Sequence, residues 1–422
     1  MRGSPPPRLV GADWLDRPET QAVFAALVAR GYAARAVGGA VRNALAGRPV
    51  ADVDLATDAR PEEVMSAAEA AGLRAIPTGL PHGTVTVVCG ERPYEITTLR
   101  RDVETHGRHA TVAFTDDWAE DARRRDFTLN ALYCDADGTI FDPLGGFPDL
   151  AARRVRFIGD ARARIREDYL RILRFFRLTA DFAEGPADAE SLGACVRERA
   201  GLAILSAERV RVELLRLLIA PRGPEIAALM QDYGLLPAVL GAAPRPTLLV
   251  RLAAIEAALG LAPDAVLRLA ALAVEVEEDA ERLRDRLRLS NDQAARLTHA
   301  ARWRGADIGP ASPAAAARVY LYRHGPAAYR ERVLIGWTRS AAPPDNQDWC
   351  HRFGLPERWQ VPRFPIKGAD VLAVGVEAGP RVGEILRAAE QWWVEGGFAA
   401  DEAALRAKLA ELAVIGGQTL RV

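Results

Sequence analysis

The hydrophobic pattern of the chain changes its period once, near Gly159. Between Arg35 and Gly159, short runs of β type alternate with helical runs, whereas from Ala161 onward the apolar residues recur with helical spacing and strands nearly vanish. Side chains of a strand alternate between two faces, and those of a helix share a face every three or four residues. We therefore expect an α+β protein, in which an N-terminal domain with a sheet precedes a helical remainder.

The boundaries of the expected elements follow from Gly, Pro and turn-forming residues. The runs of β type are 34–39, 50–57, 82–90, 92–100 and 130–143, of which the last is expected to be a hairpin turning at Asp137-Gly138. The runs 40–47 and 59–72 are helical. Breaks at 221–224, 309–310 and 340–347 divide the helical remainder. The expected domains are 1–158, 159–222, 223–310 and 311–422.

Bulk composition limits the classes of function. The 422 residues carry a formal net charge of -1, so any contact with a polyanion must come from local basic patches. The four cysteines form no C-x-x-C pair, which argues against a zinc site or a disulfide framework and favours a reducing cytoplasm. Charged residues interrupt every apolar stretch before about 18 residues accumulate, so no membrane segment is expected.

The run 50–57, VADVDLAT, places two carboxylates one residue apart. In an extended chain Asp52 and Asp54 share one face, and at about 4 Å and an effective dielectric constant of about 20 they would repel by about 4 kcal/mol. Glu95 is a third acid in a strand rhythm, where a carboxylate has no packing role. Carboxylates on neighbouring strands form an oxygen-rich site suited to Mg2+, which binds through a few carboxylates together with substrate phosphates.

A glycine pair precedes the two acids. Gly38-Gly39 lies between an expected strand and an expected helix, where glycine lets the backbone approach a bulky anion and the helix start presents free N–H groups. Such a turn alone is more often structural than functional. Because a D-x-D strand follows it, a phosphate-binding role is the better interpretation here.

Four motifs in fixed order carry a resemblance to a known family. They are GGAVRNALAGRPVADVDLAT, RRRDFTLNAL, DPLGGFPDL and EDYLRILRFFRL, and together they cover about 35–178. In this order they resemble the class II tRNA nucleotidyltransferase and bacterial poly(A) polymerase family of the DNA polymerase β superfamily. Weaker similarity continues through LSAERVRVELLRLL and the stretch 364–398, which is more like CCA-adding enzymes than poly(A) polymerases.

The resemblance implies a fold and a set of site residues. The fold is a nucleotidyltransferase head with a polymerase β-like palm and mixed sheet, followed by a helical neck, body and tail. Asp52 and Asp54 would be the metal ligands and Glu95 the third catalytic acid. The triphosphate and sugar would be met by Gly38, Gly39, Arg42, Arg124, Arg125, Asp126 and Asn130. Asn43 departs from the family, which usually has Asp there, and is therefore an unlikely metal ligand.

The helical run 163–182 offers a means of base selection. If Asp168 and Arg171 lie three apart on one helix, they face one flat ligand. Cytosine and adenine both offer an amino donor beside a ring-nitrogen acceptor, whereas uracil and guanine offer the opposite pattern. The alternative is an ordinary ion pair between Asp168 and Arg171. Arg174 and Arg177 continue the same basic strip and would contact the nucleotide or the tRNA end.

Two further regions are expected to serve the RNA substrate. The charged stretch 100–121 has no clear periodicity, and the resemblance implies a flexible loop that helps the change from C to A addition. In the tail, Arg323 and Lys367 lie among aromatic residues, a combination that suits RNA backbone and exposed bases but equally suits an amphipathic helix bundle.

The expected function is template-independent addition of CCA to the 3′ end of tRNA from CTP and ATP, with Mg2+ as cofactor and pyrophosphate as product. The chain is expected to be cytoplasmic, with no membrane or protein partner implied. A poly(A) polymerase shares every head motif and is the near alternative. A degenerate fold that only binds RNA is the distant one, but such a module has no use for adjacent acids that repel RNA.

Overall fold

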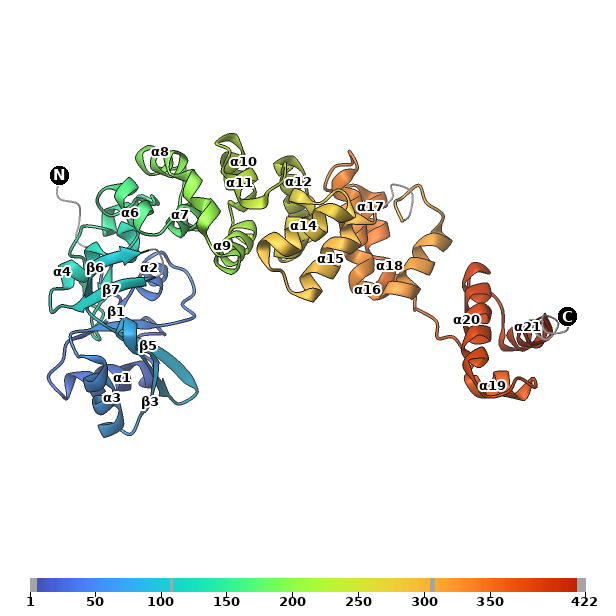
Figure 1. The fold of residues 1–422 in the computed structure, drawn as a ribbon, viewed down its shortest axis with the longest axis horizontal. Coiled ribbons are helices and arrows are strands. Elements are labelled where there is room, and N and C mark those ends of the chain that lie inside the picture. Colours follow the sequence, from blue (N-terminus) through green and yellow to red (C-terminus); the bar gives the residue numbers. More distant parts are fainter. Residues whose placement is uncertain (1–5, 107–108, 304–307, 416–422) are drawn as a thin grey trace. The chain divides into compact units, whose positions relative to one another are not determined.

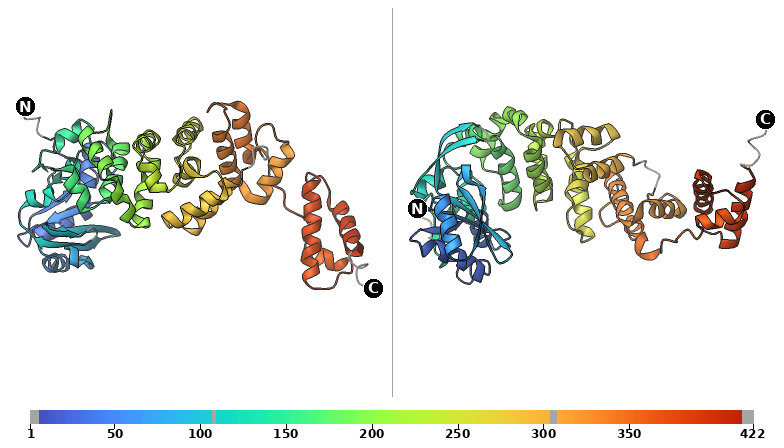
Figure 2. Two further views of the ribbon diagram at one scale, coloured as in Figure 1. Left: turned by 45° about the horizontal axis from the view of Figure 1, so that its top comes forward. Right: turned by 60° about the horizontal axis from the view of Figure 1, so that its bottom comes forward.

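The computed structural model describes residues 6–106, 109–303 and 308–415 (Figures 1 and 2). Contacts divide the chain into two compact units, one formed by 1–244 with 286–288 and one by 245–285 with 289–422. The four domains expected from the sequence form a finer division, which stays a prediction.

The first unit contains every strand of the described chain. They are β1 (Ala34–Val37), β2 (Asp54–Thr57), β3 (Arg74–Gly79), β4 (Thr84–Cys89), β5 (Arg92–Thr98), β6 (Arg100–His106), β7 (His109–Phe114), β8 (Tyr133–Cys134) and β9 (Ile140–Phe141). Its helices are α1 (Pro18–Val28), α2 (Gly39–Leu45), α3 (Pro61–Ala70), α4 (Trp118–Arg123), α5 (Phe147–Ala151), α6 (Ala161–Glu167), α7 (Leu170–Phe182), α8 (Ala189–Arg197), α9 (Ala207–Ile219), α10 (Gly223–Asp232) and α11 (Leu235–Leu240).

The main sheet is mixed, as the resemblance implied. Seven strands follow the order β3-β4-β5-β2-β1-β8-β9, in which β2 runs antiparallel to β1 and parallel to β5. The parallel register places Asp54 beside Glu95 on adjacent strands. Along β2, Leu55, Ala56 and Thr57 are fully buried, so burial of this central strand fixes which way its first residue faces. The expected α+β class is confirmed.

Two stretches of the head differ from the sequence-based expectation. The stretch 100–121 was expected as a loop, but 100–106 and 109–114 form the antiparallel two-stranded sheet of β6 and β7, and residues 107 and 108 lie outside the described residues. The sequence of β6 is charged or polar at most positions and therefore lacks the apolar alternation by which strands are recognised. Strand β3 was also missed. The hairpin β8–β9 is confirmed, with Gly138 at a φ of 83°.

The second unit contains helices and connecting loops, with no strand among its described residues. It contains α12 (Pro246–Ala258), α13 (Ala265–Ala273), α14 (Glu277–Leu287, shared with the first unit), α15 (Asn291–Ala301), α16 (Ala314–Arg339), α17 (Gln347–Phe353), α18 (Leu355–Arg358), α19 (Gly368–Ala373), α20 (Pro380–Glu395) and α21 (Glu402–Ile415). Helix α16 is kinked at Gly325-Pro326, where Gly325 has a φ of 77°. Val371, Trp393 and Leu405 belong to an apolar core that joins α19, α20 and α21.

Candidate active site

One pocket of about 690 Å³ in the first unit brings together most of the predicted site. It is lined by Gly38, Gly39, Arg42, Asp52, Asp54, Arg124, Arg125, Asp126, Asn130, Asp168, Arg171, Arg174 and Arg177, and also by Arg209 and Arg216. These residues come from segments up to 178 positions apart in sequence, the difference between 216 and 38. A pocket of this size is ordinary for a cofactor-sized ligand. Its lining combines eight arginines with four aspartates.

The turn between β1 and α2 forms one wall of the pocket. Gly38 has a φ of 68° and ψ of -117°, a conformation that side chains disfavour, whereas Gly39 begins α2 with ordinary backbone angles. A Cβ added at Gly39 would meet no atom within 4 Å. The two glycines thus serve different purposes: Gly38 allows the turn, and Gly39 leaves open space beside the backbone.

The two acids lie where the sequence placed them. Burial alternates from Asp52 to Leu55, with both aspartates exposed and Val53 and Leu55 buried, although the strand itself begins only at Asp54. Asp54 is exposed as a residue, yet partial desolvation of its carboxyl group, together with the Glu95 and Asp52 carboxylates, raises the pKa of Asp54 to about 6, against the lowering effect of Arg125. Desolvation is the largest of these causes, and a bound cation would favour the ionised form.

Glu95 lies near the pocket without lining it, and its role as the third catalytic acid stays a prediction. It is exposed on β5 beside Asp54, but it is not among the residues that line the pocket. Within the described ranges, no group of three His, Cys, Asp or Glu side chains has the arrangement of a metal site. The donor set at the pocket is therefore the pair Asp52 and Asp54, which suits Mg2+ because this ion commonly keeps waters and uses one or two carboxylates with phosphate oxygens.

Arg124 and Arg125 are held by an acid that sequence reasoning missed. Asp121 on α4 is 1% exposed, and its carboxylate accepts from Arg124 Nε at 2.8 Å, Arg125 Nη2 at 3.1 Å and the Tyr133 hydroxyl at 2.7 Å. Burial raises the pKa of Asp121, but Arg125, Arg124 and Tyr133 outweigh it and bring the pKa to about 2. The available signal was the helical spacing of Asp121 from Arg124 and Arg125.

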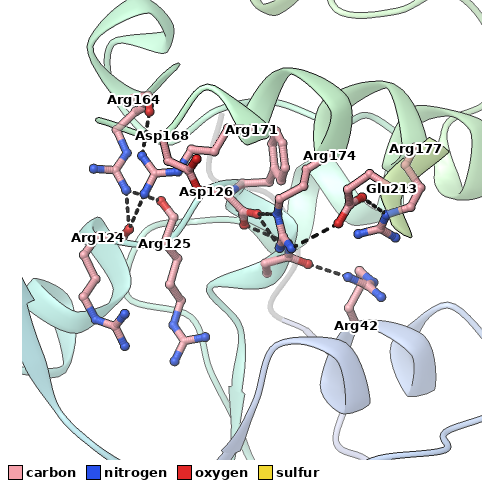
Figure 3. Close-up of polar contacts among 12 residues, drawn as sticks. Arg42, Arg124, Arg125, Asp126, Arg164, Asp168, Arg171, Arg174, Arg177 and Glu213 are labelled. Carbon is pink, nitrogen blue, oxygen red and sulfur yellow. Dashed lines mark hydrogen bonds and ion pairs between the residues drawn. The ribbon is translucent and has the colours of Figure 1, made fainter. Parts of the chain in front are cut away.

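The side chains of Asp126 and Asn130 form hydrogen bonds with neighbouring residues of the pocket (Figure 3 labels Asp126, Arg174 and Arg42). Asp126 accepts from Arg174 Nε at 2.7 Å and from the Asn130 amide at 2.9 Å, and Asn130 accepts from Arg42 Nη1 at 2.6 Å. Burial raises the pKa of Asp126, but Arg174 and the hydrogen bonds lower it to about 2. Burial and nearby Arg177 lower the pKa of Arg42 to about 10. This chain of contacts fixes Arg42 and Arg174 at the pocket.

The helix expected over 163–182 is broken, which corrects the geometry assumed for base reading. Helix α6 ends at Glu167, Asp168 is extended with a φ of -155°, and α7 begins at Leu170. The Asp168 carboxylate accepts the Leu170 N–H at 3.1 Å, a local bond by which aspartate favours helix starts over helix interiors. Asp168 and Arg171 therefore do not share one helix, although both line the pocket.

The partners of Asp168 and Arg171 also differ from the ion-pair alternative. Asp168 pairs with Arg209, with Nη2 to Oδ2 at 2.6 Å. Arg171 Nη1 donates to Glu167 Oε2 at 2.5 Å and to the Arg164 carbonyl at 2.7 Å. Asp168 and Arg171 are therefore bonded to other residues and not to each other.

Helix α9 carries the largest group of pocket residues that sequence reasoning missed. Glu213 is 5% exposed, accepts from Arg177 Nε at 2.5 Å and lies 3.8 Å from Arg174 Nη1. Arg209 and Arg216 line the pocket. These three residues are spaced i, i+4 and i+7, so a helical wheel of 207–219 would have placed them on one face.

The predicted RNA-binding residues belong to the second unit. Arg323 on α16 donates to Gln391 Oε1 at 2.5 Å and lines a pocket of about 640 Å³ with Arg363, Phe364 and Arg387. Lys367 directly precedes α19, as expected, and its backbone N–H donates to Asp370 Oδ2 at 2.8 Å. Their contact with RNA stays a prediction.

Comparisons with known proteins match the chain to nucleotide-polymerising relatives. Residues 34–156 match the family described as "Poly A polymerase head domain", and 188–245 match "Probable RNA and SrmB- binding site of polymerase A". The human mitochondrial CCA tRNA nucleotidyltransferase 1 is 33% identical over 401 residues, which are 91% of this chain and 90% of that protein. The CCA-adding enzyme of Geobacillus stearothermophilus is 41% identical over 221 residues, 51% of this chain and 53% of that protein.

Solved structures extend the similarity over the whole fold. The CCA-adding enzyme of Bacillus stearothermophilus in complex with CTP superposes with a TM-score of 0.69 at 29% identity, covering 95% of this chain and 99% of that one. The Thermotoga maritima CCA-adding enzyme complexed with tRNA shares the fold with a TM-score of 0.62 at 18% identity, covering 93% of this chain and 94% of that one. No helix of the described chain is long and apolar enough to cross a membrane.

The head motifs, the pocket and the full-length similarity lead to one family, whose CCA-adding members generally depend on a divalent metal ion. The chain belongs to the class II tRNA nucleotidyltransferase and bacterial poly(A) polymerase family, as its sequence motifs predicted.

Proposed function

We propose that this protein adds CCA to the 3′ end of tRNA from CTP and ATP and releases pyrophosphate. The observation that carries the proposal is the single pocket in which two aspartates face an arginine cluster and the Asp168 and Arg171 side chains. Identity of 33% to a CCA tRNA nucleotidyltransferase along nine-tenths of both chains supports the same substrates. The cytoplasmic location remains a prediction, since the human relative is named mitochondrial.

The catalytic end of the pocket suits phosphoryl transfer. Asp52 and Asp54 would hold Mg2+, which supplies charge neutralisation at the triphosphate and lowers the pKa of an attacking hydroxyl. Glu95, on the adjacent strand, would add to the negative field that favours the cation. Arg124 and Arg125, oriented by Asp121, bind the triphosphate, and the 3′-hydroxyl of the tRNA attacks the α-phosphate as pyrophosphate leaves.

The opposite end of the pocket selects the base. A carboxylate at Asp168 accepts the amino group of cytosine or adenine, and a guanidinium at Arg171 donates to the adjacent ring nitrogen. Uracil and guanine would set acceptor against acceptor, and an unpaired buried polar group costs about 1–3 kcal/mol. The selection needs both side chains at one pocket, which is observed, and does not need them on one helix.

Nucleotide incorporation into a tRNA that ends before CCA tests the function. We expect incorporation of C from CTP, of A only after both C residues, and no extension from ATP alone. Long A tracts made from ATP alone would instead identify a poly(A) polymerase. Absence of incorporation into any RNA would point to a binding module.

Replacement of one acid tests the site assignment. Asp52→Ala should lower incorporation by at least about a hundredfold while tRNA binding is retained, because only charge stabilisation at the reacting phosphate is lost. Asp116→Ala is the matched control, since Asp116 is exposed in the head and outside the pocket. Full activity of the Asp52 variant would refute the assignment.

A further inference from the structure

Helix α9 lies beside the base-selecting residues and contacts them through one face. Arg209 and Glu213 project from this face, where Arg209 meets Asp168 and Glu213 meets Arg177 (Figure 3 shows the Glu213 contact). Contacts between α7 and α9 are among the most extensive helix contacts of the first unit. The helix therefore supports the residues of the pocket in addition to lining it.

The contact between Arg209 and Asp168 has two hydrogen bonds. Arg209 Nη1 donates to Asp168 Oδ1 at 3.2 Å and Arg209 Nη2 donates to Oδ2 at 2.6 Å, which engages both carboxylate oxygens. Oδ1 also accepts the Leu170 N–H at 3.1 Å. Three donors from two directions thus fix the plane of the carboxylate, since a planar guanidinium fork allows little rotation.

The fixed carboxylate still has acceptor capacity. An ionised carboxylate offers about four lone-pair sites, and three are used by Arg209 and the Leu170 N–H. Both side chains of the pair are partly accessible, 27% for Arg209 and 23% for Asp168, so a ligand in the pocket can reach the remaining acceptor. The position of that acceptor is set by Arg209.

We propose that Arg209 is the positioning residue for base selection: it holds the Asp168 carboxylate in one orientation, so that a single acceptor direction faces the base. The inference rests on the proposed function, because it assumes that Asp168 reads the base. Without the fork, the carboxylate turns about its side-chain bonds and presents no fixed acceptor direction, so the pattern that distinguishes cytosine and adenine from uracil and guanine is no longer enforced. Arg209 thus controls the choice of base, while the triphosphate arginines and the metal-binding acids are unaffected.

The test compares nucleotide selectivity in single and double variants. We would measure kcat/KM for CTP, ATP, UTP and GTP with a tRNA lacking CCA, using the full chain and its Arg209→Gln, Arg209→Lys, Asp168→Ala and Asp168→Ala/Arg209→Gln variants. Arg211→Gln is the control on the same helix, since Arg211 is outside the pocket and donates to the Arg288 carbonyl. The ratio between nucleotides is taken within one protein, so it does not depend on how much of a variant is folded.

We expect Arg209→Gln to raise UTP use relative to CTP by about tenfold to a hundredfold, as expected for loss of one half-buried polar contact. Arg209→Lys should restore part of the selectivity, because lysine supplies the charge without the fork. The double variant should be no less selective than Asp168→Ala alone, because both changes remove one interaction.

Three results would overturn the inference. If Arg209→Gln slows all four nucleotides equally, Arg209 is structural or binds the triphosphate. If Asp168→Ala relaxes selectivity and Arg209→Gln does not, Asp168 reads the base without its partner, and the proposed function stands while the inference fails. Unchanged selectivity in Asp168→Ala would overturn base reading itself, and with it the role of Arg209.

Discussion

Asp54 has surroundings that disfavour its ionised form. Partial desolvation and the neighbouring carboxylates of Glu95 and Asp52 raise its pKa to about 6. Nothing in the packing of β2 requires an acid there, since the neighbouring positions Val53 and Leu55 fill the core. An acid at this position fits the proposed cation site, where protonation of Asp54 would compete with the cation.

Metal-dependent activity should therefore fall at low pH. Mg2+ binds the ionised carboxylate, and protonation removes the ligand as the pH drops below about 6, so CTP incorporation at limiting Mg2+ should decline about tenfold per pH unit below that value. Steady-state rates between pH 5 and 8 check this.

Mg2+ concentration gives the internal control for this profile. Because proton and metal compete, more Mg2+ should move the midpoint to lower pH. A midpoint near pH 4 at every Mg2+ concentration would show that Asp54 has an ordinary carboxyl pKa.

At the scale of elements, the turn from β1 to α2 has two adjacent glycines with different structural roles. Gly38 takes a backbone conformation reserved for glycine, whereas Gly39 has ordinary angles and open space beside it. The sequence shows only the pair. In the structure, Gly38 is needed for the backbone conformation of the turn, and Gly39 leaves space beside the pocket wall.

Alanine at these two positions should have different effects. Gly38→Ala should lower the free energy of unfolding by about 1–3 kcal/mol because of backbone strain. Gly39→Ala should leave stability unchanged or higher but raise KM for CTP, because a methyl group then occupies the space beside the pocket wall. Denaturant unfolding and kinetics on both variants check this, and equal losses of stability would contradict it.

The α4 segment is held to the pocket by a buried acid. Asp121 bonds Arg124, Arg125 and Tyr133 together, and Arg125 also donates to the Tyr133 hydroxyl at 3.2 Å. Since the pKa of Asp121 is lowered, its ionised form stabilises the folded state above the unfolded pKa of about 4, and this stability is lost as the pH falls toward 2.

Asp121→Asn should lower stability and weaken nucleotide binding together. Breaking a buried charge pair costs about 3–5 kcal/mol, and the freed arginines should raise KM for CTP and ATP alike. Thermal unfolding and kinetics of Asp121→Asn are compared with Asp116→Asn, an exposed neighbour. A change in the ratio of CTP to ATP use would contradict a role confined to the triphosphate.

At the scale of the whole molecule, the predicted functions fall in different units. The pocket belongs entirely to the first unit, whereas the predicted RNA-binding residues Arg323 and Lys367 belong to the second. Substitutions in the second unit should therefore change KM for tRNA without changing KM for CTP.

Removal of the tail charges should affect tRNA and not CTP. Arg323→Ala and Lys367→Ala should each raise KM for tRNA a few-fold, leave KM for CTP unchanged and reduce the salt slope of tRNA binding by about one. Lys408→Ala is the control, because the chain has only two lysines and Lys408 is paired with Glu411 at 2.8 Å. An unchanged salt slope would remove these residues from the RNA interface.

Local periodicity was sufficient for the change from a sheet-containing head to a helical remainder, and alternation in 50–57 predicted that Asp52 and Asp54 share a face. The mixed sheet and most pocket residues were instead implied by the resemblance of the four motifs to a known family. Strand β3 and the β6–β7 hairpin were missed because their side chains lack that apolar alternation.

Pairing between distant side chains was decided by the tertiary structure alone. Asp168 bonds Arg209 and not Arg171, and Asp121 gathers Arg124, Arg125 and Tyr133, because a buried or half-buried carboxylate takes the donors that packing brings to it. The sequence by itself determined which charges the chain carries, and the alternation of 50–57 placed Asp52 and Asp54 on one face. Only the folded arrangement of α7 against α9, and of α4 against β8, determined which of those charges neutralise one another and which remain free for a ligand.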